Sequence, residues 1–216
     1  MPKGFLVAFE GIDGSGKTTL ASRVDELLQE QGWSTFFVGS GCMPSESIVM
    51  QIKSITHNPD NCHMCHTTET FLYLASLAQR TEEYIIPHLE KGKVVLADRF
   101  TMSVFVLAHY ARHLPRDIVS RMVCLATREL TPNLTLLCDI EVSEAEKRKK
   151  SASSTSRKER EGAELMKTLR EGYLQEAKLL GNKCFVLRSD KLSISEMSST
   201  AVEIIMNHLS IRRCLK

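Results

Sequence analysis

The sequence predicts an α/β protein built on a parallel sheet that helices cover on both faces. Short apolar runs of strand length alternate with longer segments of helical periodicity along the chain, a pattern typical of such sheets. The first apolar run leads into a glycine-rich loop with a phosphate-binding signature. The 216 residues, 43% of them hydrophobic, suit one domain with a sizeable core. We therefore expect a single domain over residues 1–216.

The glycine-rich loop Gly11 to Thr18 reads G-x-x-x-x-G-K-T and lies between a predicted strand, Phe5 to Phe9, and a predicted helix, Lys17 to Gln31. Its glycines let successive N–H groups turn inward, and the helix start adds positive potential. The Lys17 ammonium would reach the β- and γ-phosphates of ATP, and the Thr18 hydroxyl would complete a Mg²⁺ shell. The predicted ATP-binding residues are Gly11, Asp13, Gly14, Ser15, Gly16, Lys17, Thr18 and Thr19.

A short strand and two helices are expected next. Gly32 ends the first helix, Thr35 to Val38 forms the strand, and Ser45 to Ile55 forms a helix with Ser45 as its N-cap. A long helix follows from about Thr68 to Leu89. One row along it is expected to face the core: Phe71, Leu74, Ala75, Ala78, Ile85 and Leu89. A neighbouring row holds Tyr73, Leu77, Arg80 and Tyr84.

The second half of the chain continues the alternation. The strand Val94 to Ala97 ends in Asp98-Arg99, and the carboxyl end of such a strand faces the crevice where ligands bind in open α/β sheets. The remaining predicted elements are helical segments around Ser103 to Ala111 and Arg116 to Glu129, a strand from Leu134 to Ile140, a helix from Ser143, a helix ending near Leu180, a strand from Cys184 to Leu187 and a helix from Ser193 to Leu209.

A basic segment over residues 147–160 is predicted to form a flexible lid. Lys147 to Lys150 precede six small polar residues, Ser151 to Ser156, which we expect to be mobile. Most of the cations in this segment are expected on a solvated helix face. Arg157 and Arg160 follow the mobile stretch, so they could close over the ATP phosphates as arginine fingers of the same chain.

Composition excludes several classes of partner. A net charge of +2 gives no general argument for binding a nucleic acid polymer or a membrane surface. No apolar run approaches the length of a bilayer span, and no basic and apolar leader precedes the first strand. The seven cysteines are scattered, so most are expected to be reduced. We expect a cytoplasmic protein that acts on small molecules.

Four motifs together resemble the thymidylate kinase family. They are Phe9 to Thr19, Asp98-Arg99-Phe100 with Ser103, Pro132 to Leu136 leading to Asp139, and the basic lid ahead of Arg170-Glu171-Gly172-Tyr173. The resemblance extends over nearly the whole chain. It implies a three-layer α/β/α P-loop kinase fold with a central parallel sheet of about five strands. It also implies an enzyme, usually a homodimer, that transfers the ATP γ-phosphoryl group to a deoxynucleoside monophosphate, with thymidine monophosphate (dTMP) as first choice.

Phosphoryl transfer requires a phosphate-binding loop, a metal ion and several converging cations. Arg99 is predicted to bind the acceptor phosphate bidentately, and a surface ion pair with Asp98 is the alternative. Asp98 could hold Mg²⁺ through water. By resemblance, Asp13 and Ser103 contact the acceptor, although Asp13 could instead cap its own loop. The predicted catalytic residues are Lys17, Arg99, Asp13, Arg157 and Arg160.

Two departures from the family pattern concern the acceptor. The loop Gly39 to Glu46 lacks the arginine that the family uses to hold the acceptor phosphate. Tyr73 takes the place of the ring that stacks on the base, but Leu77 falls where the family has a base-reading arginine. Arg80 lies nearly one turn further along the same row and is a further candidate for binding the base, which it could reach only if the base sat differently. We therefore keep open a kinase of this fold with another acceptor, either a different pyrimidine nucleotide or a non-nucleotide.

The segment 57–67 contains Cys62-His63-Met64-Cys65-His66, which has no counterpart in the family pattern. Cys62 and Cys65 have the spacing of a zinc knuckle, and Cys42 or one of three nearby histidines could complete a Zn²⁺ site. A second C-x-x-C is lacking, so an ordinary loop insertion stays open. The rival function is a non-catalytic ATP-binding module that uses this segment for a metal or a partner.

Overall fold

The computed structural model describes residues 4–39, 42–150 and 162–214. It contains one five-stranded sheet in the order β2-β3-β1-β4-β5, and every pairing is parallel. The strands are β1 (Phe5–Glu10), β2 (Thr35–Val38), β3 (Val94–Asp98), β4 (Leu134–Asp139) and β5 (Cys184–Arg188). The predicted parallel sheet of about five strands is therefore confirmed.

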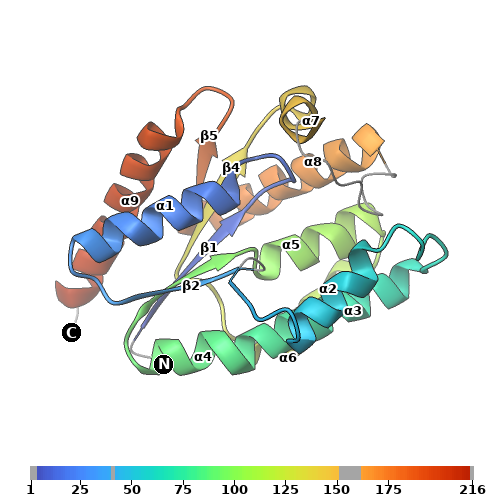
Figure 1. Cartoon of the computed structure of the whole chain (residues 1–216), viewed down its shortest axis with the longest axis horizontal. Helices are drawn as coiled ribbons and strands as arrows, with labels where there is room; N and C mark the ends of the chain where they lie inside the picture. Colours follow the sequence, from blue (N-terminus) through green and yellow to red (C-terminus); the bar gives the residue numbers. More distant parts are fainter. Residues whose placement is uncertain (1–3, 40–41, 151–161, 215–216) are drawn as a thin grey trace.

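Helices cover both faces of the sheet, with α1 and α9 on one side and the helices of the middle of the chain on the other (Figure 1). The helices are α1 (Lys17–Glu30), α2 (Ile48–His57), α3 (His66–Arg80), α4 (Ile86–Glu90), α5 (Thr101–Phe105), α6 (Arg116–Thr127), α7 (Val142–Lys150), α8 (Gly162–Leu180) and α9 (Ile194–Cys214). Two π-helical turns, η1 (Thr81–Ile85) and η2 (Val106–Ala111), and a short 3₁₀ turn, η4 (Gly181–Lys183), join them. This is the predicted three-layer α/β/α fold.

The central strand β1 shows why the chain folds into layers. Alternate side chains of a strand point to opposite faces of the sheet. Phe5, Val7 and Phe9 pack against α1 and α9, whereas Leu6 and Ala8 pack against the helices of the other layer. All six residues of β1 are buried, as expected for a parallel strand that is covered on both faces.

The long helix predicted from Thr68 to Leu89 is interrupted. The chain forms α3, then the π-helical turn η1, then α4. Because a π-helical turn holds an extra residue, it rotates the buried face of α4 relative to that of α3. The first half of the predicted core row is therefore only partly right: Leu74 is buried, but Phe71 is 57% exposed, and Leu77 from the neighbouring row is 1% exposed and lies in the core.

Other predicted boundaries also shift. The N-cap of α2 is Ser47 rather than Ser45, because the Met50 N–H donates to Ser47 Oγ at 3.3 Å. The helix α6 ends at Thr127, before two residues with left-handed φ angles, Arg128 and Glu129. Arg157, Arg160 and most of the predicted lid lie outside the described residues. None of the helices in the described ranges is long and apolar enough to cross a bilayer.

Candidate active site

The phosphate-binding loop joins β1 to α1 at the carboxyl end of the sheet. Gly14 has a φ of 85°, and a Cβ atom there would lie 2.7 Å from the Ala145 carbonyl oxygen of α7. Gly11 also has a positive φ, and a Cβ there would clash with the Cys138 carbonyl of β4. Both positions require glycine because the backbone runs so close to neighbouring chain. The predicted loop therefore forms, with α1 starting at Lys17.

Lys17 is only 7% exposed and folds back over the loop. Its Nζ lies 3.5 Å from both the Ile12 carbonyl oxygen and Asp13 Oδ1, which are long contacts for an ammonium. Burial, followed by the charge of Arg99, lowers the pKa of Lys17. Nearby, Ser15 Oγ is buried and has no hydrogen-bond partner in the described part of the chain. A buried cation with weak contacts beside an unsatisfied hydroxyl suits the oxygens of a phosphate chain.

Thr18 and Asp98, the two residues that we expected to bind Mg²⁺, lie in direct contact. The Thr18 hydroxyl donates to Asp98 Oδ2 at 2.6 Å. The other oxygen, Asp98 Oδ1, is buried and accepts no hydrogen bond from the residues described. A hydroxyl and a carboxylate at this distance, next to a phosphate-binding loop, fit the oxygen shell that Mg²⁺ prefers.

Arg99 follows β3 in a left-handed backbone conformation with a φ of 65°. Its guanidinium donates to the Gly11 carbonyl oxygen at 2.9 Å, the Ser103 hydroxyl at 3.1 Å, the Tyr173 hydroxyl at 2.9 Å and the Asp13 carboxylate. Burial opposes its charge, but Tyr173 and then the nearby carboxylates outweigh burial and raise the pKa of Arg99. The ion pair that we considered with Asp98 is instead made with Asp13. Arg99, Asp13 and Ser103 are thus brought together.

Two residues of this cluster were missing from the predicted site. Glu10 ends β1, is fully buried, and accepts from the Phe100 N–H at 2.8 Å and from both the N–H and the hydroxyl of Ser103. Burial raises the pKa of this carboxyl group. Tyr173 on α8 joins Ser103 at 2.7 Å, and burial raises its pKa as well. A charged residue that ends a wholly apolar strand was the available signal for Glu10.

The acceptor side differs from the expectation. Leu77 belongs to the buried cluster between α3 and the sheet, so its predicted place in a base pocket is corrected to a core position. Tyr73 packs half-buried against the same cluster. Arg80 reaches the site, but it donates to two backbone carbonyls, Asp98 O at 3.2 Å and Arg99 O at 2.8 Å.

One cation of the predicted lid contacts the phosphate-binding loop. Arg148 on α7 donates to the Ser189 carbonyl oxygen at 2.7 Å, and its other terminal nitrogen lies 3.5 Å from the Gly14 carbonyl oxygen. Its contacts place a further positive charge beside Gly14 and Gly16.

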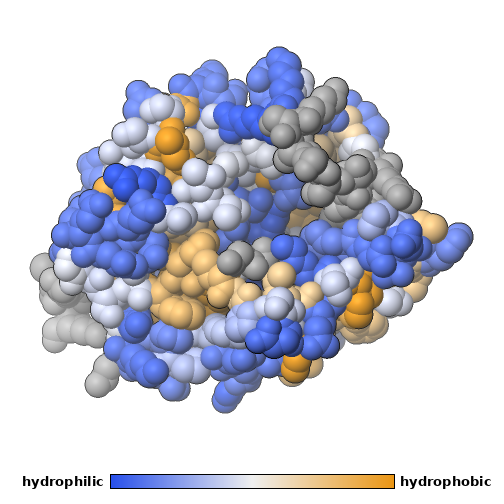
Figure 2. All heavy atoms as spheres, in the orientation of Figure 1, coloured by the Kyte–Doolittle hydropathy of each residue, from blue (hydrophilic) through white to orange (hydrophobic). Residues whose placement is uncertain are grey.

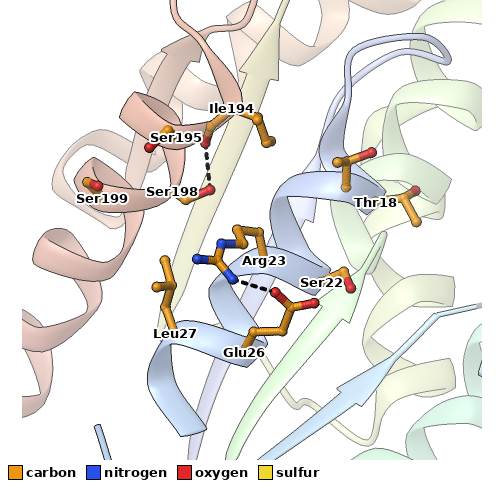
Figure 3. Close-up of a pocket in the computed structure, with 10 residues that line it drawn as sticks. Thr18, Ser22, Arg23, Glu26, Leu27, Ile194, Ser195, Ser198 and Ser199 are labelled. Carbon is orange, nitrogen blue, oxygen red and sulfur yellow. Dashed lines mark hydrogen bonds and ion pairs between the residues drawn. The ribbon is translucent and has the colours of Figure 1, made fainter. Parts of the chain in front are cut away.

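A groove of about 560 Å³ runs beside the start of α1. It is lined by Thr18, Thr19, Ser22, Arg23, Glu26, Leu27, Ile194, Ser195, Ser198 and Ser199. Figure 3 shows α1 on one side and the first turns of α9 on the other, with Arg23 and Glu26 paired at 2.7 Å near the middle. The groove begins at two threonines of the phosphate-binding segment and is rich in hydroxyl groups. Figure 2 shows that this face of the molecule is hydrophilic over much of its area, with an apolar area near its centre.

The Cys-His segment does not form the zinc site that we kept open. No group of three or more His, Cys, Asp or Glu side chains placed to hold a metal occurs among the described residues. Cys65 instead is the N-cap of α3, because its Sγ accepts from the Thr68 N–H at 3.5 Å. Hydrogen bonds from Thr68 lower the pKa of the Cys65 thiol. This leaves the loop interpretation.

Comparison with known proteins agrees with this geometry. The family model described as thymidylate kinase matches residues 9–199. The thymidylate kinase of Pelobacter propionicus is 34% identical over 216 residues, covering 96% of this chain and 96% of that protein. The thymidylate kinase of Geobacter sulfurreducens is 36% identical over 179 residues, covering 79% and 82%. That of Thermoanaerobacter sp. strain X514 is 32% identical over 207 residues, covering 96% and 100%.

Proposed function

The chain belongs to the thymidylate kinase family, and from that premise we propose that it phosphorylates thymidine monophosphate with ATP. It is an ATP-dependent phosphotransferase of the nucleoside-monophosphate kinase class. The observation that carries the proposal is the position of Arg99. Its guanidinium contacts the Gly11 carbonyl and the Asp13 carboxylate, so a cation suited to the acceptor phosphate lies directly beside the loop that would hold ATP.

Each site residue has a separate role in phosphoryl transfer. An oxygen of the acceptor phosphate forms a bond to the γ-phosphorus, and the bond from that phosphorus to the β–γ bridging oxygen breaks, which releases ADP. The loop N–H groups and Lys17 hold the β- and γ-phosphates, and Arg99 holds the acceptor phosphate. Negative charge on the group in transfer is then shared between Lys17 and Arg99. Thr18 and Asp98 would hold Mg²⁺, which neutralises phosphate charge when bound.

We assign the nucleoside half of ATP to the groove between α1 and α9. Thr18 and Thr19 of the phosphate-binding segment are among the residues that line this groove, so the groove adjoins the place where the phosphate chain would leave the loop. Its free volume is adequate for a nucleoside, and its serine hydroxyls can bond sugar and base edges. Replacing Ser195 with Trp should raise the KM for ATP and leave the KM for the acceptor unchanged. A changed acceptor KM with an unchanged ATP KM would contradict this assignment.

A cytoplasmic homodimer is part of the proposal. Leu125 on α6 is 82% exposed, and Ile118 on the same helix and Phe71 on the adjacent α3 are also exposed. Apolar side chains gathered on neighbouring helices favour an interface between copies. Sedimentation of the wild type and of Leu125→Glu tests it: a wild type that is monomeric at micromolar concentration contradicts the dimer.

The acceptor is tested by kcat/KM over a panel of nucleoside and deoxynucleoside monophosphates. Because Leu77 is buried and apolar, it supplies no donor for a base carbonyl, and we expect only a modest preference for thymidine over deoxycytidine monophosphate. A preference beyond about 10⁴-fold would require a base-reading group elsewhere. Absence of turnover with every member would favour a non-nucleotide acceptor or a binding module.

A further inference from the structure

The turn after β3 has a backbone conformation that needs support. Arg99 has a φ of 65°, in the left-handed region that residues with a Cβ atom rarely adopt. Such a conformation persists only where surrounding contacts hold it. The conformation of this turn matters because Asp98 and Arg99 are consecutive residues. The turn directs the Asp98 side chain toward Thr18 and the Arg99 side chain toward Asp13.

Two sets of contacts hold the amide side of the turn. The Arg99 N–H donates to the Phe9 carbonyl oxygen at 2.9 Å, which continues the pairing of β3 with β1. The Phe100 N–H and the Ser103 N–H both donate to the buried Glu10 carboxyl group. These contacts fix the N–H groups but leave the carbonyls of Asp98 and Arg99 to another partner.

Arg80 is that partner. One terminal nitrogen donates to Asp98 O at 3.2 Å and the other to Arg99 O at 2.8 Å, so one planar guanidinium holds two consecutive carbonyls. Arg80 forms no ion pair with any described residue, and its buried Nε has no hydrogen-bond partner there. Arg80 is half-buried and the charges of Asp98 and Glu10 favour its cation, but it forms an ion pair with neither, so the two backbone carbonyls are the groups that its guanidinium binds.

The position of Arg80 in its helix supports the same role. It is the last residue of α3, directly before the π-helical turn η1. The extra residue of a π-helical turn rotates the helix face, and such turns are frequent at functional sites. Leu77, one turn earlier, packs into the core, while Arg80 reaches across to β3.

We propose that Arg80 is a positioning residue of the kinase: by holding the carbonyls of Asp98 and Arg99, it fixes the left-handed turn that aims Arg99 at the acceptor phosphate and Asp98 at Thr18. The role rests on the proposed function, because it acts through residues assigned to phosphoryl transfer. It replaces the direct base contact that the sequence suggested for Arg80.

The first test does not depend on activity. Amide hydrogen exchange is compared in the wild type, Arg80→Met and Arg80→Lys. Loss of Arg80 should speed exchange of the amides of Arg99, Phe100 and Ser103 at least about tenfold and leave the β4 amides unchanged. Unchanged exchange at these three amides in a folded Arg80→Met would overturn the proposal. If Arg80→Met does not fold, the exchange rates of the same three amides are compared between the wild type and Arg80→Lys. Lysine retains the positive charge but lacks the two terminal nitrogens that bind two carbonyls at once.

The second test is a double-mutant cycle with Arg99→Met. Arg80→Met should lower kcat/KM for the acceptor at least about tenfold in the wild type but less than about threefold when Arg99 is already replaced. Equal losses in both backgrounds would show that Arg80 does not act through Arg99. Lys167→Met is the control, since Lys167 is 56% exposed and pairs with Glu164 on its own helix, α8, and it should leave activity unchanged.

The two proposals can fail separately. A wild-type protein that phosphorylates no nucleoside monophosphate refutes the proposed function, whereas the exchange measurement still decides whether Arg80 holds the turn. If the wild type is active and the amide exchange of the turn is unchanged in Arg80→Met, only the positioning role of Arg80 is refuted.

Discussion

The hydroxyl of Thr18 lies 2.6 Å from the carboxylate of Asp98, although the two residues are 80 positions apart in the chain. The parallel pairing of β1 with β3, in which Phe9 is opposite Asp98, brings the start of α1 next to the end of β3. One threonine oxygen and one carboxylate therefore meet beside the phosphate-binding loop. This pair is the structural basis for the proposed Mg²⁺ site.

Thr18→Val and Asp98→Asn should each raise the Mg²⁺ concentration needed for half-maximal activity by at least about tenfold, because each removes one oxygen function from the shell. Turnover is measured as a function of Mg²⁺ at saturating ATP and acceptor. Thr168→Val is the matched control, since its hydroxyl bonds only to the Glu164 carbonyl within α8 among the contacts described. If both variants need the same Mg²⁺ concentration as the wild type, Thr18 and Asp98 do not bind the metal ion.

Lys17→Ala should fold normally and lose several orders of magnitude in turnover, because the lost ammonium stabilises charge that grows in the transition state. Thermal melting and steady-state kinetics are measured together, with Lys91→Ala at an exposed position as control. A variant that keeps more than about a tenth of the wild-type turnover shows that Lys17 does not have this role.

Glu10→Gln should change the pH dependence of stability. Burial raises the pKa of Glu10 above its ordinary 4.5, so the native state binds this proton more tightly than the unfolded chain does. The stability contributed by the protonated group is complete below pH 4.5 and is lost as the pH rises through the folded pKa. The free energy of unfolding of Glu10→Gln relative to wild type should therefore increase from about pH 4 to about pH 8 in urea titrations. A difference that stays constant over this range means that Glu10 has no raised pKa.

Leu77→Arg should destabilise the fold by about 3 kcal/mol or more, because it places a charge in a core position that offers no partner. It should not sharpen the preference for thymidine monophosphate. Leu77→Met, which conserves volume, should cost less than about 1.5 kcal/mol. Normal melting of Leu77→Arg together with a stronger preference for thymidine would show that this position reaches the base after all.

Local sequence was sufficient to predict the strands, most helices and the phosphate-binding loop. The spacing of Gly11, Gly14 and Gly16 sets the loop backbone, and the apolar runs of β1, β3 and β4 are too short and too apolar for anything but buried parallel strands. The strands, the helices and the loop depend on backbone geometry within a few residues. They can therefore be predicted without knowing which segments pack against them. The same local signals predicted Lys17, Thr18, Asp98 and Arg99 as site residues.

Only the tertiary structure decided which side chains meet. Glu10 bonds to Phe100 across 90 positions and Tyr173 to Arg99 across 74, and neither pairing leaves a periodic signal in the sequence. The exchange of roles between Leu77 and Phe71 comes from one π-helical turn, which shifts the helical phase without any distinctive residue type. Arg80 could be assigned to two carbonyls rather than to a base only when the distance between α3 and β3 was known. Local periodicity sets each element, but strand order, register and helix phase set the contacts between them, and these arise from packing of the whole chain.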